Sequence, residues 1–377
     1  MTSKQRLMAA LKREDVDYVP CAPVWWSQGR EGFEWAKGSR EKYLEKVINE
    51  LGLDAFLSFS IPPNYYSGIT QKIWIEHSPK EKYPLLCKAI DTPKGKLKAI
   101  IHLTDDYPHG KDIPFMDDFS VSRYVKPWIE SVEDVEKFAY VYLSPSNETL
   151  KKARQKLLVL QKLSQKWQIP IIGSAGMSLN SPIHLMGAEQ AILSSIDNPE
   201  IIDRLLEIIH STNRKILEVM LSWGIKIVIR NGWYDTTDFW SPDQYKKWVM
   251  PQLKKDIDLA HSADSIFIYQ ACTGIKPLIP FFKELNFNCL LEVEPVLSHL
   301  SMKRLKKELG DKKSFWGGIS APEHIGRGTP HKVREAVRKA FSDFGHRGLI
   351  LKAVPSIRSI WPWENVLAMI DEWKKMR

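Results

Sequence analysis

Ile225-Lys-Ile-Val-Ile229 and Gly348-Leu-Ile-Leu351 are short, almost wholly apolar runs, and each is followed or preceded closely by a helical pattern. Such runs are typical of parallel strands that are covered on both faces. Further runs rich in Val, Ile and Phe recur along the chain in the same way. The eight predicted strands are Tyr18–Trp25, Leu53–Phe59, Pro170–Ser174, Ile225–Arg230, Ser265–Gln270, Phe287–Glu292, Ser314–Ile319 and Arg347–Lys352.

Amphipathic segments fill the gaps between these strands and predict helices. Ser39 is a good N-cap for a helix over Glu41–Leu51, and Ser131 is a good N-cap for another. The other predicted helices are 3–12, Asn147–Gln168, Pro199–Trp223, Pro242–Ser262, Lys276–Leu285, Ser301–Leu309, Pro330–Phe344 and Pro362–Lys375. Eight strands that alternate with helices predict an α/β fold, a (β/α)8 TIM barrel with residues 3–12 as an N-terminal helical extension. A doubly wound sheet would want a glycine-rich turn after its first strand, and Trp25-Trp26-Ser27-Gln28 is not one.

One segment interrupts the alternation of strands and helices. Cys87–Asp91 and Lys96–Leu103 flank the turn Thr92-Pro-Lys-Gly95, which predicts a β-hairpin. The hairpin lies between the second and third barrel strands, so we expect an insertion after the second strand. The chain shows no internal repeat and no low-complexity linker, and we predict a single domain over residues 1–377.

Composition and charge narrow the class of protein. The 377 residues are 44% hydrophobic, which allows a large core, and no run of about 18 apolar residues could span a membrane. Four scattered cysteines do not make a disulfide framework, so we expect a cytoplasmic, reducing compartment. The net charge is +9, but the lysines lie beside acids at helical spacing and no nucleic-acid motif accompanies them, which argues against nucleic-acid binding. A basic surface suits an acidic protein partner or an anionic substrate.

Several segments, taken in order, resemble the uroporphyrinogen decarboxylase and corrinoid-dependent methyltransferase superfamily, in its methyltransferase-like branch. Arg6–Lys12 with Asp17–Pro20 is similar to the family's opening helix and first strand, and Ser181–Glu189 with Asp197–Glu200 is similar to a helix pair. The C-terminal block is the most specific part and consists of Gly317-Gly-Ile319, Gly328-Thr-Pro330 and Pro362-Trp-Glu-Asn365. The resemblance covers nearly the whole chain. It implies a TIM barrel with its chemistry at the carboxyl ends of the strands.

The resemblance ends at the residues that carry chemistry. Uroporphyrinogen decarboxylases have an aspartate after the second strand, where this chain has Ser58-Phe-Ser-Ile-Pro62, and a histidine after the last strand, where it has Ala353–Ile357. The methyltransferase branch binds zinc through His-x-Cys after the fifth strand and a Cys after the eighth. The aligned residues here are Gln270, Cys272 and one near Ser356, so one thiol remains.

Two carboxylates at the end of the sixth strand reach the same barrel mouth. The resemblance therefore implies a zinc ion as a candidate cofactor, with Cys272, Glu292 and Glu294 as candidate ligands. We expect only one of the two glutamates to face the barrel interior. The alternative for Cys272 is a small buried core residue.

The richest loop at the predicted mouth is Arg230-Asn-Gly-Trp-Tyr-Asp-Thr-Thr-Asp-Phe-Trp240. Its aromatic side chains could form a box for an aromatic ring or a methylated cation, or they could merely cover the barrel end. Asp235 and Asp238 are candidate general acids, and either could instead cap the helix that starts at Pro242. Arg30 could meet an anion and Lys352 a substrate carboxylate, unless both are solvated loop charges. The candidate substrate-binding residues are Trp25, Trp26, Arg30, Asn231, Trp233, Tyr234, Trp240, Gln270 and Lys352.

The resemblance and these residues together lead to one functional prediction and two alternatives. We expect a methyltransferase that moves a methyl group from a small O- or N-methylated substrate, with a methoxyaromatic favoured by the aromatic mouth, to the corrinoid of a separate protein. The protein would mainly supply orientation and either protonation or a Lewis acid. The alternatives are a decarboxylase-like lyase acting on a tetrapyrrole or other carboxylated ring, and a non-catalytic binding barrel. By analogy with the superfamily, a homodimer is expected.

Overall fold

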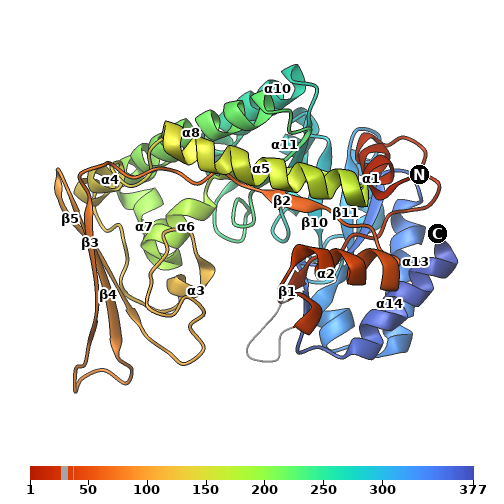
Figure 1. Cartoon of the computed structure of the whole chain (residues 1–377), viewed down its shortest axis with the longest axis horizontal. Coiled ribbons are helices and arrows are strands. Elements are labelled where there is room, and N and C mark those ends of the chain that lie inside the picture. Colours follow the sequence, from red (N-terminus) through yellow and green to blue (C-terminus); the bar gives the residue numbers. More distant parts are fainter. Residues whose placement is uncertain (27–32, 37) are drawn as a thin grey trace.

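Seven parallel strands form the centre of the computed structural model, which describes residues 1–26, 33–36 and 38–377 (Figure 1). Their order in the sheet is β12-β11-β10-β9-β8-β7-β2, so neighbours in the sheet follow the order of the chain. The strands are β2 (Leu57–Phe59), β7 (Ile171–Met177), β8 (Ile227–Asn231), β9 (Ile266–Gln270), β10 (Cys289–Val293), β11 (Ser314–Ser320) and β12 (Leu349–Val354).

The first predicted strand closes this sheet in an irregular form. On one side Leu351 N donates to Pro20 O at 2.8 Å and Ala22 N donates to Leu351 O at 3.0 Å; on the other, Asp54 N donates to Cys21 O at 2.9 Å. Regular pairing begins only at β1 (Trp25–Trp26), which runs parallel to β13 (Ile357–Arg358). The predicted TIM barrel is confirmed, although most of Tyr18–Trp25 is not regular strand.

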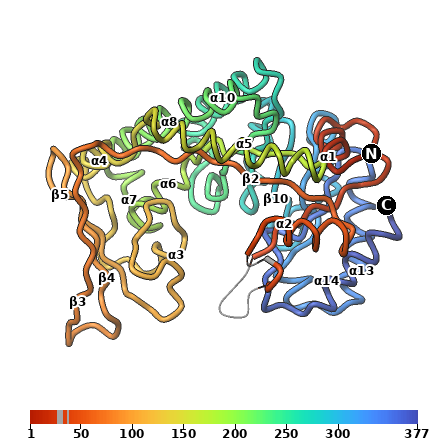
Figure 2. The backbone as a smooth tube through the Cα atoms, in the orientation of Figure 1, coloured from red at the N-terminus to blue at the C-terminus, as the bar shows by residue number. Residues whose placement is uncertain are grey.

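Helices surround the barrel, as Figures 1 and 2 show. They are α1 (Ser3–Lys12), α2 (Arg40–Leu44), α4 (Val132–Phe138), α5 (Asn147–Trp167), α6 (Asn180–Met186), α7 (Ala188–Asp197), α8 (Pro199–Ser222), α9 (Pro242–Trp248), α10 (Met250–Ser262), α11 (Ile279–Glu284), α12 (Met302–Leu309), α13 (Pro330–Phe344) and α14 (Trp363–Met376). In the described part of the chain, no helix combines the length and the apolar character needed to cross a bilayer.

Local sequence explains where several helices begin and break. The Ser39 side chain accepts a hydrogen bond from Lys42 N and the Ser131 side chain accepts one from Asp134 N, as N-caps do. The predicted helix over Glu41–Leu51 is α2 followed by a π-helix over Glu45–Glu50. The predicted helix over Pro242–Ser262 is two helices, because Pro251 lacks the backbone N–H that a continuous helix would need.

The interior of the barrel is apolar at its N-terminal end and polar at its C-terminal end. Helix α1 closes the N-terminal end, where its side chains pack against strand residues that point inward. This interior cluster includes Leu7, Ala10, Leu11, Ile172, Ile227, Ile266, Ile268, Leu291, Trp316 and Ile350. Alternate residues of a strand share a face, so the next inward positions toward the C-terminal end are Ser58, Ser174, Asn231, Gln270 and Lys352. We call these five residues the polar layer.

The predicted hairpin is confirmed and belongs to a larger insertion. Strands β4 (Leu85–Thr92) and β5 (Gly95–His102) pair with β3 (Thr70–Glu76) and β6 (Tyr124–Lys126) in a four-stranded antiparallel sheet, the insertion sheet. The short helix α3 (Asp118–Val121) lies in the connection between β5 and β6. In Figure 2 the chain runs from β2 along the molecule to reach this sheet, at the end opposite the two termini.

Candidate functional site

A β-bulge at the end of β10 re-aims Glu292 into the barrel. Leu291 pairs with Trp316 and Val293 pairs with Gly317, so Glu292 is an extra residue on its strand. Its φ of +70° lies in the left-handed region, which is uncommon for a residue other than glycine. Strain of this kind concentrates at functional sites, because the surrounding structure must hold it in place.

The Glu292 carboxylate forms a buried ion pair with Lys352. Lys352 Nζ donates to Glu292 Oε1, and Gln270 Nε2 donates to the same oxygen at 3.3 Å. Glu292 is 3% exposed and Lys352 is 1% exposed. Glu292 Oε2 is buried and has no hydrogen-bond partner among the described residues. Burial raises the pKa of Glu292, while the charge and hydrogen bond of Lys352 oppose the shift.

Cys272 lies close to this pair but remains a thiol. Burial raises its pKa well above the usual range, and the charges of Glu292, Glu294 and Asp238 add to that effect. The charge of Lys352 acts in the opposite direction. Among the described residues around Cys272, carboxylates therefore outweigh ammonium groups, although the whole chain is basic.

The three residues predicted as zinc ligands do not form a ligand set. Glu294 Oε2 accepts hydrogen bonds from Val296 N at 2.7 Å, Leu297 N and Ser298 N at 3.2 Å, so this carboxylate holds the loop after β10. Glu292 is paired with Lys352, so a metal at this carboxylate would have to displace an ammonium. Within the described ranges no three His, Cys, Asp or Glu side chains are grouped so that they could hold a metal. These residues do not fit zinc.

The two aspartates predicted as general acids have different environments. Asp235 is 0% exposed, and its Oδ2 accepts a hydrogen bond from Tyr269 OH at 3.2 Å. Burial raises its pKa to about 7. Asp238 is exposed, and Thr273 Oγ1 donates to its Oδ2 at 2.5 Å. Neither side chain belongs to the polar layer, and neither fills the predicted capping role, because Ser241 caps α9.

The predicted aromatic box is dispersed. Trp240 is 2% exposed, packs against Trp248 and donates through Nε1 to Tyr234 O at 2.8 Å, so it covers the barrel end. Trp25 packs against Trp35, 5.2 Å between ring centroids, away from Trp26. Trp233 is half-buried. Trp26 is 46% exposed at the mouth.

Asn231 orders the loop that follows β8. Its Oδ1 accepts hydrogen bonds from Asn180 Nδ2 at 2.7 Å and from Trp233 N at 3.2 Å. Asn180 Oδ1 in turn accepts one from Tyr234 N at 2.8 Å. Asn231 is therefore a positioning residue for the loop. Arg30, the remaining predicted residue, lies outside the described residues.

The insertion contributes mouth residues that sequence reasoning missed. Asp118 Oδ1, on α3, lies 2.9 Å from Tyr234 OH, which donates to it, and 2.8 Å from His184 Nε2. The next residue, Phe119, stacks on Trp26 with ring centroids 6.0 Å apart. Helix α3 therefore contacts both sides of the barrel mouth. No sequence motif identifies these residues. The one indication in the sequence was the predicted insertion after the second strand.

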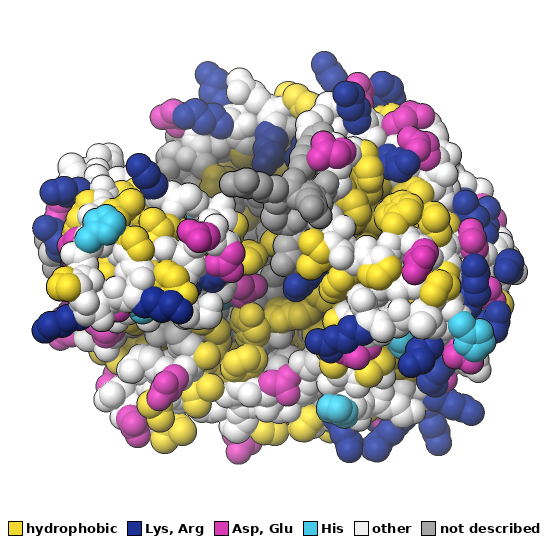
Figure 3. All heavy atoms as spheres, turned by 90° about the horizontal axis from the view of Figure 1, so that it is seen from below, with side chains coloured by type: hydrophobic (Ala, Val, Ile, Leu, Met, Phe, Trp, Pro, Cys, Tyr) yellow, Lys and Arg dark blue, Asp and Glu magenta, His cyan; other side chains and the backbone are white. Residues whose placement is uncertain are grey.

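The face between the insertion sheet and the barrel is hollowed, and hydrophobic side chains line much of the hollow (Figure 3). Charged atoms of both signs are visible inside it. Ser58 and Ser174 of the polar layer are exposed although they point into the barrel, which shows that the barrel interior opens to solvent at this level. The hollow therefore gives access to the polar layer.

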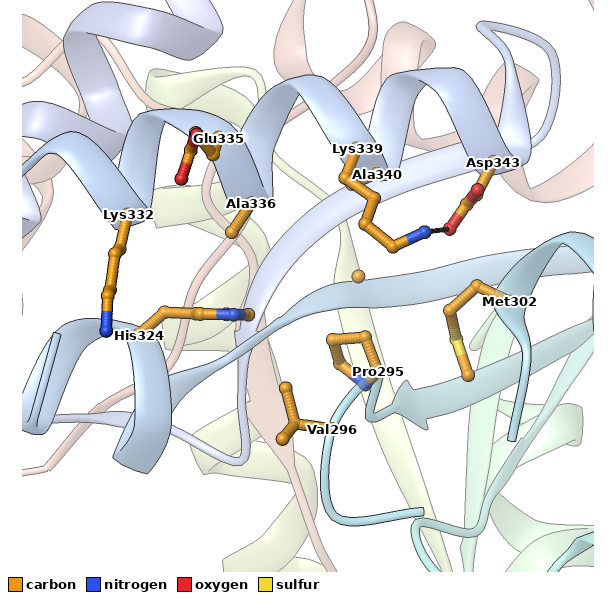
Figure 4. A pocket seen from close by; sticks show the side chains of 11 residues that line it. Pro295, Val296, Met302, His324, Lys332, Glu335, Ala336, Lys339, Ala340 and Asp343 are labelled. Atoms are coloured by element: carbon orange, nitrogen blue, oxygen red, sulfur yellow. Dashed lines mark hydrogen bonds and ion pairs between the residues drawn. The ribbon is translucent and has the colours of Figure 1, made fainter. Parts of the chain in front are cut away.

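A separate groove of about 340 Å³ lies on the outside of the barrel, between α13 and the loop after β10 (Figure 4). Its apolar lining includes Pro295, Val296, Met302 and Ala336. His324 points into it and accepts a hydrogen bond at Nδ1 from Ser320 N at 3.1 Å. None of the predicted site residues is among the described residues that line this groove.

Residues 115–376, more than half of the chain, match the family described as Uroporphyrinogen decarboxylase (URO-D). The chain belongs to this family. The segment Ser58–Pro62, where the resemblance implies the decarboxylase aspartate, lies outside the matched residues, and its Ser58 belongs to the polar layer. No curated protein matches the sequence.

Solved structures agree on the fold. A methyltransferase from Methanosarcina mazei is 20% identical, covers 100% of this chain and 99% of its own, and superposes with a TM-score of 0.57. At that identity the likeness shows a shared fold alone. A B12-independent methionine synthase from Shewanella sp. W3-18-1 is 11% identical over 95% of this chain and 96% of its own, with a TM-score of 0.44, which is too weak to bear on function.

Proposed function

We propose that this URO-D family member is a methyltransferase that moves a methyl group from a small O- or N-methylated substrate, with methoxyaromatics favoured, to the corrinoid of a separate protein. The buried Glu292–Lys352 pair carries the proposal, because it lies at the carboxyl ends of the strands and is held by a strained bulge. The aromatic side chains at the mouth suit a flat or methylated donor.

The chain's own contribution in this reaction is orientation and protonation. Gln270 and the Glu292–Lys352 pair place a hydrogen-bonding surface at the C-terminal end of the barrel, next to its apolar interior cluster. Such a surface can hold the heteroatom that carries the methyl group in one orientation, which is worth several orders of magnitude in rate. When bound at the mouth, the corrinoid would supply the nucleophile. The URO-D decarboxylase reaction is less suited, because Ser58–Pro62 contains no carboxylate where the resemblance implies one.

The proposal is tested by measuring methyl transfer to a corrinoid protein, with the visible absorption of the corrinoid as the readout. Purified protein would be mixed with reduced corrinoid protein and a panel of methoxyaromatics and methylated amines. We expect methylation with at least one donor, and a loss of about 100-fold or more in Glu292→Gln, since the positioned pair is broken. Glu372→Gln is the matched control, because Glu372 is also 3% exposed and ion-paired, to Arg338 on the outside of the barrel.

Other results would point to the alternatives. Release of carbon dioxide from a carboxylated ring without methyl transfer would establish a lyase. A tightly bound ligand that is never turned over would establish a binding barrel. Equal rates for wild type and Glu292→Gln would remove the observation on which the proposal rests.

A further inference from the structure

The proposed reaction needs a proton donor, and the two predicted acids, Asp235 and Asp238, lie outside the polar layer. A departing oxygen or nitrogen leaves with an electron pair and needs a proton unless it is a very weak base. The Asp235 side chain lies outside the polar layer and accepts a hydrogen bond from Tyr269 OH, and Asp238 is exposed and accepts one from Thr273 Oγ1. The acid must instead lie where the hollow meets the polar layer.

Lys352 lies there, and its ammonium group has more N–H donors than it has acceptors among the described residues. An ammonium carries three N–H donors, and the one acceptor recorded for Lys352 Nζ within the described residues is Glu292 Oε1. The side chain is 1% exposed, so bulk water does not readily satisfy the other two N–H bonds. Buried donors left unpaired are costly, which makes them attractive partners for an acceptor atom on a ligand.

Glu292, in turn, has a carboxylate oxygen that lacks a hydrogen-bond donor among the described residues. Its Oε2 is buried without a donor among the described residues, while Oε1 is shared by Lys352 and Gln270. A purely structural ion pair would be expected to use both oxygens and more of the ammonium's protons. This pair instead offers a donor and an acceptor side by side, and a strained bulge keeps the acceptor in the barrel.

We infer that Lys352 is the general acid of the site, donating a proton to the heteroatom from which the methyl group departs, and that Glu292 is the positioning residue that holds the Lys352 ammonium. The inference rests on the proposed methyl transfer. The bond between the methyl carbon and the heteroatom breaks, and its electron pair stays on the heteroatom. A proton from Lys352 Nζ joins that pair, the methyl group goes to the corrinoid nucleophile, and neutral Lys352 regains a proton from water that enters once the product has left.

Binding of a coloured phenol tests the position of Lys352 without any corrinoid. Phenols are the products expected from methoxyaromatics, and 4-nitrophenol reports its own ionisation by absorbance. An ammonium at the phenolic oxygen favours the phenolate, so we expect the pKa of bound 4-nitrophenol to lie about one unit below that of the free compound. We expect the shift to disappear in Lys352→Met and to persist in Lys352→Arg, which keeps the charge.

Lys313 provides the matched control. It is also 1% exposed, but its Nζ donates to Leu285 O at 2.6 Å and Phe287 O at 3.1 Å at the opposite end of β11. Lys313→Met is expected to leave the titration of bound 4-nitrophenol unchanged. If Lys352→Met does not fold, Lys352→Arg and the double variant Lys352→Met with Glu292→Leu, which removes the unpaired charge, carry the test.

The rate of methyl transfer then tests the acid itself. Across methoxyarenes with leaving phenols of different pKa, the loss in Lys352→Arg should be largest for the most basic leaving group and small for a nitrophenol, which departs without a proton. A uniform loss across the series would overturn the acid role while leaving methyl transfer standing. Absent binding, or an unshifted pKa of bound 4-nitrophenol, would overturn the placement of Lys352 even if no corrinoid protein accepts a methyl group.

Discussion

Asp235 shows how strongly burial acts on one side chain in this barrel. It is 0% exposed, and removing a carboxylate from water favours its protonated form. The charge of Arg230 and the hydrogen bond from Tyr269 OH act in the opposite direction, yet the pKa of Asp235 is raised to about 7. At neutral pH this residue therefore costs the fold stability.

Asp235→Asn should remove that cost. Because the folded state binds this proton more tightly than the unfolded chain, wild-type stability falls as the pH rises from about 4 to 7 and is flat above. The variant should lack this slope and gain roughly 2–4 kcal/mol at pH 8, since each pKa unit is worth about 1.4 kcal/mol. Urea unfolding at pH 5 and pH 8 measures the difference. Asp238→Asn is the exposed control, and equal slopes in Asp235→Asn and wild type would contradict the prediction.

The polar site could be predicted from the sequence only in part. Strand ends in a predicted barrel directed attention to Gln270, Lys352 and Glu292, which the structure places next to one another. Residues two apart share a face of a regular strand, so the separation of Glu292 from Glu294 depends on the bulge. A bulge depends on pairing with a neighbouring strand, which a single chain's local pattern does not encode. The pairing of Lys352 with Glu292 follows from that same tertiary feature.

At the level of the strands, the bulge at Glu292 lies against Gly317 of the neighbouring strand β11. A Cβ on Gly317 would lie 2.7 Å from Val293 N and even closer to Val293 O, so the two strands approach as closely as they do only because this residue has no side chain. Its partner residue follows Glu292 directly. The conformation of Glu292 thus depends on a glycine on another strand.

Gly317→Ala should therefore disturb function as well as stability. We expect a loss of about 1–3 kcal/mol in the free energy of unfolding, as overpacking usually gives, and loss of the pKa shift of bound 4-nitrophenol as Glu292 moves. Gly110→Ala is a control, because its φ of +60° strains any side chain while nothing lies within 4 Å. Thermal unfolding and the phenol titration together decide the matter. A destabilised variant with an unchanged titration would mean that the bulge does not position Glu292.

The regular helices and strands were predicted from local periodicity. The strands that were missed show that periodicity carries no information on pairing between distant segments. The apolar runs at Ile225–Arg230 and Ser265–Gln270 became β8 and β9 with shifts of a residue or two. Strands β3 and β6 were missed, since β3 is mostly exposed and so lacks an apolar face. Their strand conformation comes from pairing with the hairpin, which is a non-local effect.

At the scale of the whole molecule, helix α3 of the insertion contacts the barrel at the mouth of the hollow. Tyr234 OH and His184 Nε2 approach Asp118, and Phe119 stacks on Trp26. Burial acts to raise the pKa of Asp118, but hydrogen bonds from His184 and Tyr234 and the charge of His184 outweigh it and lower the pKa. This contact is therefore strongest above the ordinary pKa of an aspartate and weakens as the carboxylate is protonated.

Phe119→Ala tests whether these contacts control entry to the polar layer. Loss of the aromatic pair should cost about 1 kcal/mol and free α3 from the barrel side of the mouth. We expect faster amide hydrogen exchange over Asp118–Val121, and a KM for the methyl donor raised severalfold with kcat changed less than about twofold, since the donor would lose a wall of its site while the Glu292–Lys352 pair stays intact. Tyr66→Ala is the matched control, because Tyr66 packs edge-on against Tyr140, 5.6 Å between ring centroids, within the insertion. Faster exchange with an unchanged KM would show that α3 docks on the barrel without forming part of the donor site, and unchanged exchange would show that the stacking of Phe119 on Trp26 is not needed to hold α3 on the barrel.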